Sequence, residues 1–309
     1  MIKIEKISTY LPKIHINLKK KYKNISKQFL EKKIGASKVL RKNKEGVVDM
    51  CVKAFLNAKI PDTKNIKLIV LCTQNPDYYG LPHNSAIIQS KIGLDKNIAC
   101  LDLSQGCAGY IYGLKVADSF LKNNEIALFF TCDPYSKIIK KGDYNTELLF
   151  GDASTLSILK KTKQSTKSIL GRSCKTNNGL ICSDFYTDGK FYDSIINKKG
   201  ILKMDGKKVM HFCSTIVPEF INSFLKKNNF KLNDIDSIYL HQGSKHVVET
   251  IYKKLGVAEH QKIKIIKDIG NTVSSSIPIL IKKNYINKRK KILLCGFGVG
   301  LSISVGIIG

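Results

Sequence analysis

An internal repeat constrains the fold of this chain more than any other feature of its sequence. Three short apolar segments of the first half have counterparts of similar sequence in the second half: Leu68–Gln74 with Ile238–Gln242, Ile98–Leu103 with Ile263–Asp268, and Glu125–Phe130 with Lys291–Gly296. The spacing also repeats, because 28 residues separate Ile98 from Ile126 and likewise Lys264 from Ile292. The pattern predicts two similar halves, residues 1–162 and 163–309, each in the order strand, helix, strand, helix, strand.

Short apolar runs alternate with longer segments of helical periodicity along the whole chain. The runs expected to form strands are Ile2–Ile7, Leu68–Thr73, Ile98–Leu103, Ile126–Thr131, Leu156–Leu159, Ile238–His241, Ile263–Ile266, Ile292–Cys295 and Leu301–Ile307. The segments expected to form helices are Gly46–Ala58, Asn84–Ile92, Ala108–Lys122, Lys208–Lys227, Lys245–Leu255 and Ser274–Ile286. Apolar strands interleaved with helices are typical of buried sheets covered by helical layers. The sequence therefore predicts an α/β fold, with Leu68–Thr73 and Ile98–Leu103 as fully buried central strands.

The C-terminal segment Ile292–Gly309 resembles a membrane span in length and charge. It contains no charged residue over 18 positions, close to what a membrane-spanning helix needs. Its five glycines, however, divide the apolar residues into two short runs, so we expect two buried strands joined by a glycine-rich turn. At the other end, Met1–Pro12 is charged and strand-like rather than a signal peptide. We expect no membrane span.

Cysteine and charge content narrow the expected location, ligands and partners. The nine cysteines include no CxxC pair, so the sequence predicts free thiols, no metal site and a cytoplasmic protein. The 52 basic and 24 acidic residues give a formal charge of +28, which favours acidic partners such as nucleic acid, an anionic membrane surface or an acidic protein. Only three basic residues are arginines, and no nucleic-acid-binding motif is present. We therefore do not expect nucleic acid binding.

Cys107 is the strongest candidate for a reactive residue. It lies in the segment Ser104–Tyr110, directly after an expected strand and before an expected helix. The neighbouring glycines allow a tight turn and the close approach of a substrate. The helix N-terminus is expected to favour the thiolate and so to activate the sulfur as a nucleophile. The alternative is an inert buried cysteine, which we expect for the other eight.

His241 and Asn271 gain significance from their expected proximity to Cys107. Taken alone, His241 can be a hydrogen-bonded histidine at a strand end, and Asn271 can be a turn or N-cap residue. If the halves repeat, however, Cys107 and Asn271 occupy equivalent turns in opposite halves and face the strand end that carries His241. A cysteine nucleophile with His and Asn as hydrogen-bond donors suits acyl-thioester chemistry.

At these residues the chain resembles the β-ketoacyl-acyl-carrier-protein synthase III family of the thiolase superfamily. The matching motifs occur in the family's order and are Thr73–Tyr78, Gln89–Gly93, Asp102–Gly109, Phe150–Asp152, Thr187–Gly189, His241-Gln242, Lys253–Gly256, Gly270–Thr272 and Phe297–Gly300. The resemblance implies a thiolase-like fold, in which two pseudo-symmetric halves form α-β-α-β-α layers. It also implies a condensing acyltransferase that joins an acyl thioester to malonyl-carrier protein with loss of carbon dioxide.

The resemblance assigns roles to individual residues. Cys107 is the acylated nucleophile, His241 and Asn271 form the decarboxylation pair, and the backbone N–H groups of Cys107 and Val299 form the oxyanion hole. The residues expected to contact the substrate's pantetheine are Ser244, Met204, Gly206 and Phe297. Leu81 is expected to act as an acyl-pocket gate contributed by the partner subunit of a homodimer. The residues expected to dock an acidic acyl carrier protein are Lys207, Lys208, Lys253 and Lys254.

The chain also departs from the family pattern. It contains no Trp, so the family's adenine-stacking residue is absent, and Ser244 stands where the family usually has Asn. The resemblance implies no separate cofactor, because coenzyme A or the carrier's phosphopantetheine arrives as part of the substrate. These departures favour a carrier-bound acyl donor or a dedicated secondary pathway over an ordinary acetyl-CoA primer. Two alternatives remain: an acyltransferase of the same family that does not decarboxylate, in a secondary or surface-glycan pathway, and a carrier-binding protein without activity.

Overall fold

Two main sheets of the same plan form the framework of the protein. The computed structural model describes residues 1–60, 62–163, 179–264, 267–284 and 290–309. The strands of the first sheet, in spatial order, are β1 (Ile2–Tyr10), β7 (Ser154–Lys161), β6 (Ile126–Cys132), β4 (Ile66–Cys72) and β5 (Ala99–Leu103). β4 is parallel to both of its neighbours, whereas β7 is antiparallel to both of its own.

The second sheet repeats this arrangement. Its strands, in the corresponding order, are β8 (Leu180–Thr187), β13 (Ser302–Ile308), β12 (Ile292–Gly298) and β11 (Ser237–Leu240). β11 and β12 are parallel, and β13 is antiparallel to β12 and β8. At the position in the second sheet that corresponds to β5 in the first, Ile238 of β11 forms an isolated parallel bridge with Lys262. The shared order and strand directions confirm the expected pair of pseudo-symmetric halves, while a boundary after residue 162 stays a prediction.

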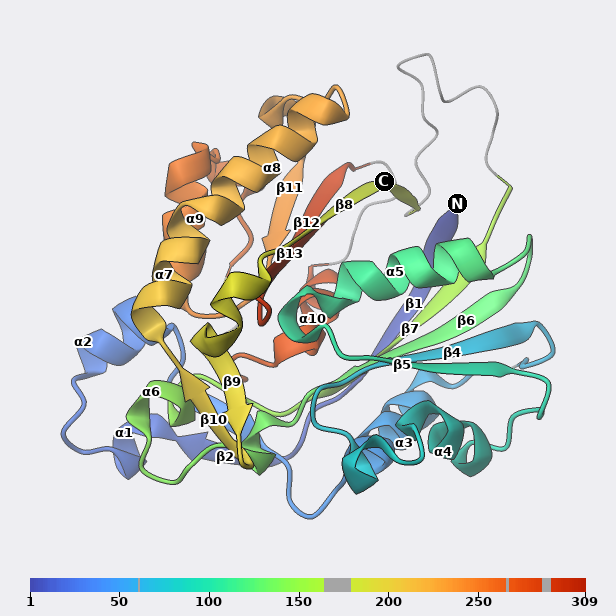
Figure 1. The fold of residues 1–309 in the computed structure, drawn as a ribbon, viewed down its shortest axis with the longest axis horizontal. Coiled ribbons are helices and arrows are strands. Elements are labelled where there is room, and N and C mark those ends of the chain that lie inside the picture. Colours follow the sequence, from blue (N-terminus) through green and yellow to red (C-terminus); the bar gives the residue numbers. More distant parts are fainter. Residues whose placement is uncertain (61, 164–178, 265–266, 285–289) are drawn as a thin grey trace.

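Helices form one layer between the sheets and one layer outside each sheet (Figure 1). In the central layer, α5 (Gly109–Phe120) packs against strands of both sheets, and α10 (Ser276–Lys283) lies beside it. The helices on the outer face of the first sheet are α3 (Val47–Ala58) and α4 (Asn84–Lys91). Those on the outer face of the second are α8 (Ile216–Lys227) and α9 (Lys245–Leu255). The resulting α-β-α-β-α layering is the predicted one.

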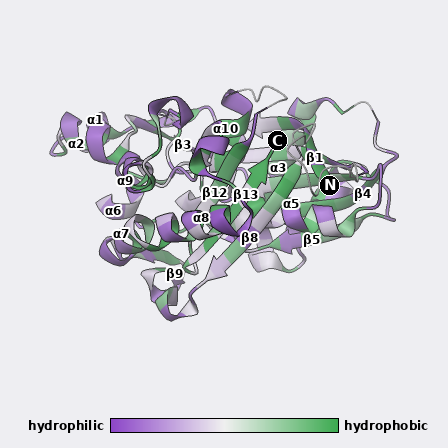
Figure 2. Ribbon diagram, turned by 90° about the horizontal axis from the view of Figure 1, so that it is seen from above, coloured by the Kyte–Doolittle hydropathy of each residue, from purple (hydrophilic) through white to green (hydrophobic). Residues whose placement is uncertain are grey.

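The strands of the main sheets are largely hydrophobic, whereas the outer helices contain both hydrophilic and hydrophobic residues (Figure 2). Every residue of β12 and β13 is buried, which confirms that Ile292–Gly309 forms two buried strands rather than a membrane helix. Among the residues that the structure describes, no helix is both long and apolar enough to cross a membrane. β4 is buried except at Lys67, as expected, but no residue of β5 is fully buried. β5 is the edge strand of the first sheet in the single chain.

Two predicted elements are wrong in part. The expected helix Lys208–Lys227 is two helices, α7 (Gly206–Ser214) and α8, separated by a break at Thr215. Pro218 explains the break, because its nitrogen has no hydrogen to donate to the carbonyl of Ser214. The expected strand Ile263–Ile266 is absent at residues 263 and 264, and its last two residues lie outside the described part.

Two small hairpins that the sequence did not predict stand beside the main sheets. One pairs β2 (Ile14–Asn17) with β3 (Lys38–Arg41), and the other pairs β9 (Ile195–Lys198) with β10 (Ile201–Met204). The chain between β2 and β3 contains α1 (Leu18–Lys21), α2 (Lys27–Phe29) and a π-helical turn, Leu30–Ile34. A further short helix, α6 (Tyr144–Glu147), packs against β10.

Candidate active site

The three candidate catalytic residues from the two halves meet in one cavity of about 300 Å³. Cys107 comes from the turn after β5, His241 from the end of β11, and Asn271 from the loop before α10. The cavity wall also contains other residues predicted for the site, namely Met204, Gly206, Ser244, Phe297 and Val299. The structure therefore brings together the catalytic, oxyanion-hole and pantetheine residues that the motifs predicted.

Glycines at neighbouring positions favour the tight turn that holds Cys107. A 3-10 turn, Gly106–Ala108, connects β5 to α5, and Gly106 has a left-handed φ of +49°. A Cβ atom on Gly106 would lie 2.4 Å from the side-chain oxygen of Gln74. From the other half, β12 passes so close that a Cβ on Gly298 would lie 3.0 Å from the Cys107 sulfur. The glycine-rich motifs thus permit close packing around the nucleophile.

Burial of the Cys107 thiol opposes the activation that the helix N-terminus is expected to provide. Burial raises the pKa of the thiol well above its ordinary value, and the nearby Asp133 carboxyl raises it further. The backbone N–H groups of Val299 and of Cys107 itself donate toward the sulfur and oppose this shift in pKa. The resting sulfur is therefore a neutral thiol with two donors beside it. They belong to the same two residues that the resemblance assigned to the oxyanion hole.

His241 is a buried, neutral imidazole. Its Nδ1 atom lies 2.8 Å from the hydroxyl oxygen of Ser276 on α10, and its ring meets Phe297 edge-on, with 5.5 Å between ring centroids. Burial lowers the pKa of His241 to about 3, with a smaller opposite effect from the Val273 backbone. When the Ser276 hydroxyl donates to Nδ1, the ring proton lies on Nε2. His241 can then donate a hydrogen bond without carrying charge.

The lowered pKa of His241 predicts that the folded protein loses stability in acid. Replacing His241 should remove this part of the loss. Between pH 6.5 and about 3 the unfolded state binds a proton at His241 that the folded state excludes, so stability falls as the pH falls. Between pH 7.5 and 4.5 the free energy of unfolding of the wild type should drop by about 2–3 kcal/mol more than that of His241→Gln. Urea unfolding at both pH values measures this difference. An equal drop in both proteins would contradict the neutral, buried imidazole.

Asn271 presents its amide N–H₂ to the cavity because its oxygen is already engaged. The side-chain oxygen accepts a 2.9 Å hydrogen bond from the backbone N–H of Val273. Val273 has φ of +53°, which is uncommon for a β-branched residue. The Asn271 backbone donates to Leu149 at 2.7 Å and accepts from Gly151 at 2.8 Å. The Phe150–Asp152 motif of the first half therefore fixes the position of Asn271 in the second.

Asp133 is a buried carboxyl group that the sequence analysis did not single out. It supports both the turn after Asn271 and the turn that holds Cys107. Asp133 accepts a hydrogen bond from Ser274, in the turn after Asn271, and a 2.6 Å bond from the backbone N–H of Gln74. Burial raises the pKa of Asp133 to about 6, although these hydrogen bonds oppose the rise. Asp133 thus connects the Asn271 turn to the residue that packs against Gly106. The one sequence signal for such a partner was the hydroxyl run Ser274–Ser276.

The cavity mouth includes residues from the unpredicted N-terminal hairpin region. Lys33 and Ile34 line the cavity, and the Lys33 amine lies 3.4 Å from Nε2 of His246 on α9. A Cβ on Gly35 would lie 2.5 Å from Cβ of Lys245, so this segment packs directly on the start of α9. No sequence pattern indicated that residues 14–41 reach the site.

The remaining predicted residues lie outside the cavity or serve a second purpose. Ser244 lines the cavity but also caps α9, accepting from the Val247 N–H at 3.4 Å. Leu81 is 85% exposed and does not line this chain's own cavity. The four predicted docking lysines lie on two helices, Lys207 and Lys208 in the first turn of α7 and Lys253 and Lys254 in the last turn of α9. Among the described residues, no group of three or more His, Cys, Asp or Glu side chains could hold a metal ion.

Known proteins of similar sequence and fold share this architecture. Residues 101–178 match the family described as 3-Oxoacyl-[acyl-carrier-protein (ACP)] synthase III, and residues 225–309 match its C-terminal family. A beta-ketoacyl-[acyl-carrier-protein] synthase III of Clostridium botulinum (strain Okra / Type B1) is 34% identical over 261 residues, covering 81% of this chain and 78% of that protein. The Clostridium tetani (strain Massachusetts / E88) protein of the same name is 30% identical over 332 residues, covering 99% and 98%.

A comparison with solved structures agrees with the comparison of sequences. The crystal structure of 3-oxoacyl-[acyl-carrier-protein] synthase III from Aquifex aeolicus VF5 superimposes with a TM-score of 0.88 at 22% identity, covering 99% of each chain. At 22% identity, the structural similarity supports the thiolase-type fold. The two Clostridium sequences, at 30% and 34% identity, support membership of the family. The chain therefore belongs to the beta-ketoacyl-acyl-carrier-protein synthase III family of condensing enzymes.

Proposed function

We propose that the protein condenses an acyl thioester with malonyl-carrier protein, with loss of carbon dioxide, through an acyl-Cys107 intermediate. One observation carries the proposal: a cysteine flanked by two backbone donors shares one cavity with a neutral His241 and the amide donor of Asn271. None of the three brings a fixed negative charge, so together they suit a reaction that develops negative charge on thioester oxygens.

In the first half-reaction the Cys107 sulfur attacks the carbonyl carbon of the acyl thioester. The thiol must lose its proton as the sulfur–carbon bond forms, because burial keeps it neutral at rest. The oxygen of the tetrahedral intermediate accepts hydrogen bonds from the N–H groups of Cys107 and Val299. Each such donor is typically worth about 3–4 kcal/mol. The thiolate of coenzyme A or carrier protein leaves and takes up the proton that the Cys107 thiol lost, and the acyl group remains on Cys107.

In the second half-reaction the malonyl thioester loses carbon dioxide. The electrons of the breaking carbon–carbon bond move onto the thioester oxygen as an enolate, and the Nε2–H of His241 and the amide of Asn271 stabilise it. The enolate carbon then attacks the acyl carbon on Cys107, and a new carbon–carbon bond forms. The Cys107 thiolate leaves and is reprotonated. Splitting the reaction at a covalent intermediate predicts ping-pong kinetics.

Carbon dioxide release separates this proposal from an acyltransferase without decarboxylation. The acylated protein is incubated with carboxyl-labelled malonyl-carrier protein, and both label release and product mass are followed. One carbon dioxide for each 3-oxoacyl product supports condensation. Transfer of the acyl group to an alcohol or amine without release of label would instead support the acyltransferase, and binding without any reaction would support a carrier-binding protein.

The basic residues near the mouth support docking of an acidic acyl carrier protein. Lys207 follows Gly206, which lines the cavity, and Lys208 pairs with Asp193 at 3.0 Å. Lys253 lies eight residues beyond the start of α9, a rise of about 12 Å along the helix from the mouth. Opposite charge on the two proteins would raise the encounter rate and fix their orientation. The absence of Trp favours such a carrier over free coenzyme A.

Charge reversal at Lys253 and Lys254 should weaken reaction with the carrier but not with small substrates. We expect kcat/KM for acyl- or malonyl-carrier protein to fall about tenfold in Lys253→Glu/Lys254→Glu, with little change for small acyl thioesters. Raising the salt concentration from about 0.05 to 0.5 M should slow the wild type with carrier, because the Debye length shrinks from roughly 14 to 4 Å. The matched control is Lys64→Glu/Lys67→Glu. It reverses two charges at the start of β4, the end of the strand away from the active site. Equal losses with both substrate types would remove the docking claim.

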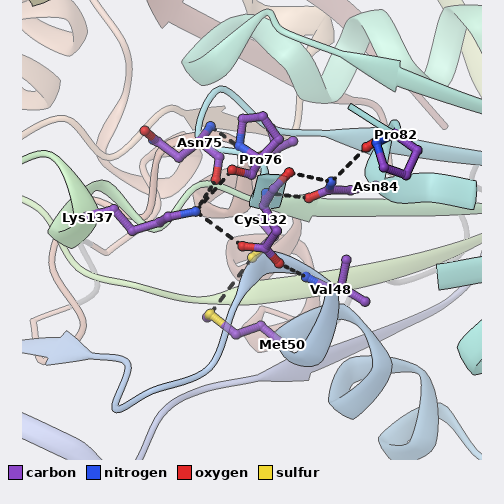
Figure 3. Close-up of polar contacts among 10 residues, drawn as sticks. Val48, Met50, Asn75, Pro76, Pro82, Asn84, Cys132 and Lys137 are labelled. Atoms are coloured by element: carbon purple, nitrogen blue, oxygen red, sulfur yellow. Dashed lines mark hydrogen bonds and ion pairs between the residues drawn. The ribbon is translucent and has the colours of Figure 1, made fainter. Parts of the chain in front are cut away.

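Two exposed features support a homodimer as the working form. The edge strand β5 leaves Leu101 39% exposed, although its sequence reads as a buried strand. The loop after β4 exposes Tyr78, Tyr79 and Leu81, and Tyr79 is fully exposed. Lys137 fixes this loop through the carbonyls of Asn75 and Pro76 (Figure 3). A second copy that covers β5 and this loop would place Leu81 at the partner's site.

Leu81→Asp should weaken the dimer. A charged side chain in an apolar interface costs several kcal/mol unless it is paired, so sedimentation at about micromolar concentration should show a shift toward monomer and a matching loss of activity. Leu56→Asp makes the same change at an exposed position of α3 and serves as the control. A wild-type protein that sediments as a stable, active monomer at this concentration would refute the dimer.

A further inference from the structure

Arg41 is the one arginine among the residues that the structure describes. Only three of the chain's 52 basic residues are arginines, so lysine stands at almost every basic position. Arg41 ends β3 and is half-buried, and its guanidinium donates hydrogen bonds to the backbone carbonyls of Leu40, Glu147 and Phe150. A planar guanidinium donates from two nitrogens in a fixed arrangement, which a lysine ammonium does not offer. The contacts therefore point to a role that depends on the shape of this side chain.

The bonded carbonyls belong to the segment of the first half that holds Asn271. One guanidinium nitrogen, Nη1, donates to the Phe150 carbonyl, and Nη2 donates to the Glu147 carbonyl at 3.2 Å. Phe150 forms an isolated parallel bridge with Asn271. On either side of this bridge, the Asn271 backbone donates to Leu149 at 2.7 Å and accepts from Gly151 at 2.8 Å. The guanidinium therefore holds the residue with which the Asn271 backbone is paired.

β3 also contacts the Asn271 loop directly. The Leu40 N–H donates to the Ile269 carbonyl at 3.3 Å, and the Leu40 carbonyl accepts from the Asp152 N–H at 3.1 Å. A Cβ on Gly151 would lie 1.8 Å from the Ile269 carbonyl oxygen, so these backbones pack without space between them. Three segments, β3, residues 147–152 and residues 269–271, thus form one backbone network. A shift of the middle segment has to move the Asn271 backbone with it.

We propose that Arg41 is a positioning residue for decarboxylation: its guanidinium fixes residues 147–150 and, through them, the Asn271 amide that binds the enolate oxygen. This inference rests on the proposed function, since it concerns the step that Asn271 serves. Arg41 does not line the active-site cavity, so it acts through Asn271 and not on the substrate. Acylation of Cys107 should not depend on Arg41, because backbone N–H groups bind the oxyanion of that step.

A positive charge at this position would not by itself require arginine. Burial lowers the pKa of Arg41, while the carboxyls of Asp152 and Glu147 oppose the shift. Arginine remains protonated in such surroundings because its ordinary pKa is very high. A lysine in its place would keep a basic group but offer a single donor nitrogen. Arg41→Lys therefore tests the contact through two nitrogens.

The test compares carbon dioxide release with acylation in Arg41→Lys. Acylation of Cys107 by the acetyl thioester of N-acetylcysteamine is followed by intact mass, and the acylated protein is then mixed with carboxyl-labelled malonyl-carrier protein. We expect release of carbon dioxide to fall at least about tenfold, because a misplacement of about 1 Å can cost about 10²-fold in rate. Acylation should stay within about threefold of wild type.

Lys161→Met is the matched control for Arg41→Lys. It removes a basic side chain that donates to the carbonyl and the carboxylate of Asp118, at the end of β7 away from the active site. Both steps should stay within about threefold of wild type in this variant, because distant sites act independently.

A double-mutant cycle with Asn271→Ala separates positioning from a general loss of stability. Once Asn271→Ala has removed the amide, Arg41→Lys has no donor left to position. We therefore expect it to lower carbon dioxide release by less than about threefold in that background. A loss of about tenfold in both backgrounds would overturn the positioning role, because additive effects indicate independent sites.

The remaining outcomes distinguish this inference from the proposed function. Arg41→Lys with wild-type carbon dioxide release, or with acylation and release lost together, would overturn the role of Arg41 alone. A wild type that forms no acyl-Cys107 or releases no carbon dioxide would overturn the proposed function itself. Urea unfolding shows whether each variant is folded. Should Arg41→Lys fail to fold, the same cycle is measured with Arg41→Gln, which keeps a planar group with hydrogen-bond donors.

Discussion

Replacing Cys107 with serine should abolish the covalent intermediate and nearly all activity. The hydroxyl of Cys107→Ser is a far weaker nucleophile than the sulfur, because it is much less readily deprotonated. Intact-mass measurement should show one acyl group on the wild type after mixing with a short acyl thioester, and none on the variant. Condensation should fall by at least about 10³-fold, as expected when a covalent nucleophile is removed.

The other cysteines provide the matched control for Cys107. Cys72 is completely buried and lies against the same turn, with its sulfur 4.0 Å from the Gly106 carbonyl oxygen. Cys72→Ser should retain the acyl adduct, because this sulfur does not line the cavity. An adduct that persists in Cys107→Ser, or that disappears in Cys72→Ser alone, would contradict the assignment of the nucleophile.

Removing the amide of Asn271 or the imidazole of His241 should slow decarboxylation while sparing acylation. Each side chain donates one hydrogen bond to the enolate oxygen, and loss of one preorganised donor typically costs about 10²–10³-fold in rate. In Asn271→Ala and His241→Ala we therefore expect carbon dioxide release to fall by that factor. Formation of acyl-Cys107 should stay within about threefold of wild type, because its oxyanion is bound by backbone donors.

The contrast between the two steps identifies the cause. A folding defect would lower acylation and decarboxylation together, so retained acylation is the internal control in each variant. Equal losses in both steps, in a variant that unfolds at the same urea concentration as the wild type, would show that His241 and Asn271 act on the cysteine and not on the malonyl group. Unchanged carbon dioxide release would remove them from the reaction altogether.

Much of the fold followed from the sequence because the repeat and the apolar strands are local patterns. β4, β6, β12 and β13 are buried strands that the hydrophobic runs predicted, and the 28-residue spacing correctly indicated two equivalent halves. The glycine-rich turn between β12 and β13 was also predicted, because its glycines interrupt the apolar run Ile292–Gly309. These features depend on few residues that are near one another in the sequence.

Features that depend on contacts between distant segments were not predicted. The β2–β3 region reaches the cavity mouth only because Gly35 packs against Lys245, and no periodicity signals such a contact. The sequence did not show how deeply Cys107 is buried, and this burial raises the pKa of its thiol. Asp133 accepts a hydrogen bond from Ser274, a partner 141 residues away along the chain.

Chasing a preformed acyl-Cys107 with malonyl-carrier protein tests the central claim most directly. The acylated protein is freed of excess thioester and mixed with one equivalent of carboxyl-labelled malonyl-carrier protein, and the masses of both proteins are followed with time. We predict that the acyl group leaves Cys107 as one equivalent of carbon dioxide appears and the carrier gains the mass of a 3-oxoacyl chain. An acyl group that stays on Cys107 while carbon dioxide is released, or that leaves without any release of carbon dioxide, would contradict decarboxylating condensation at this site.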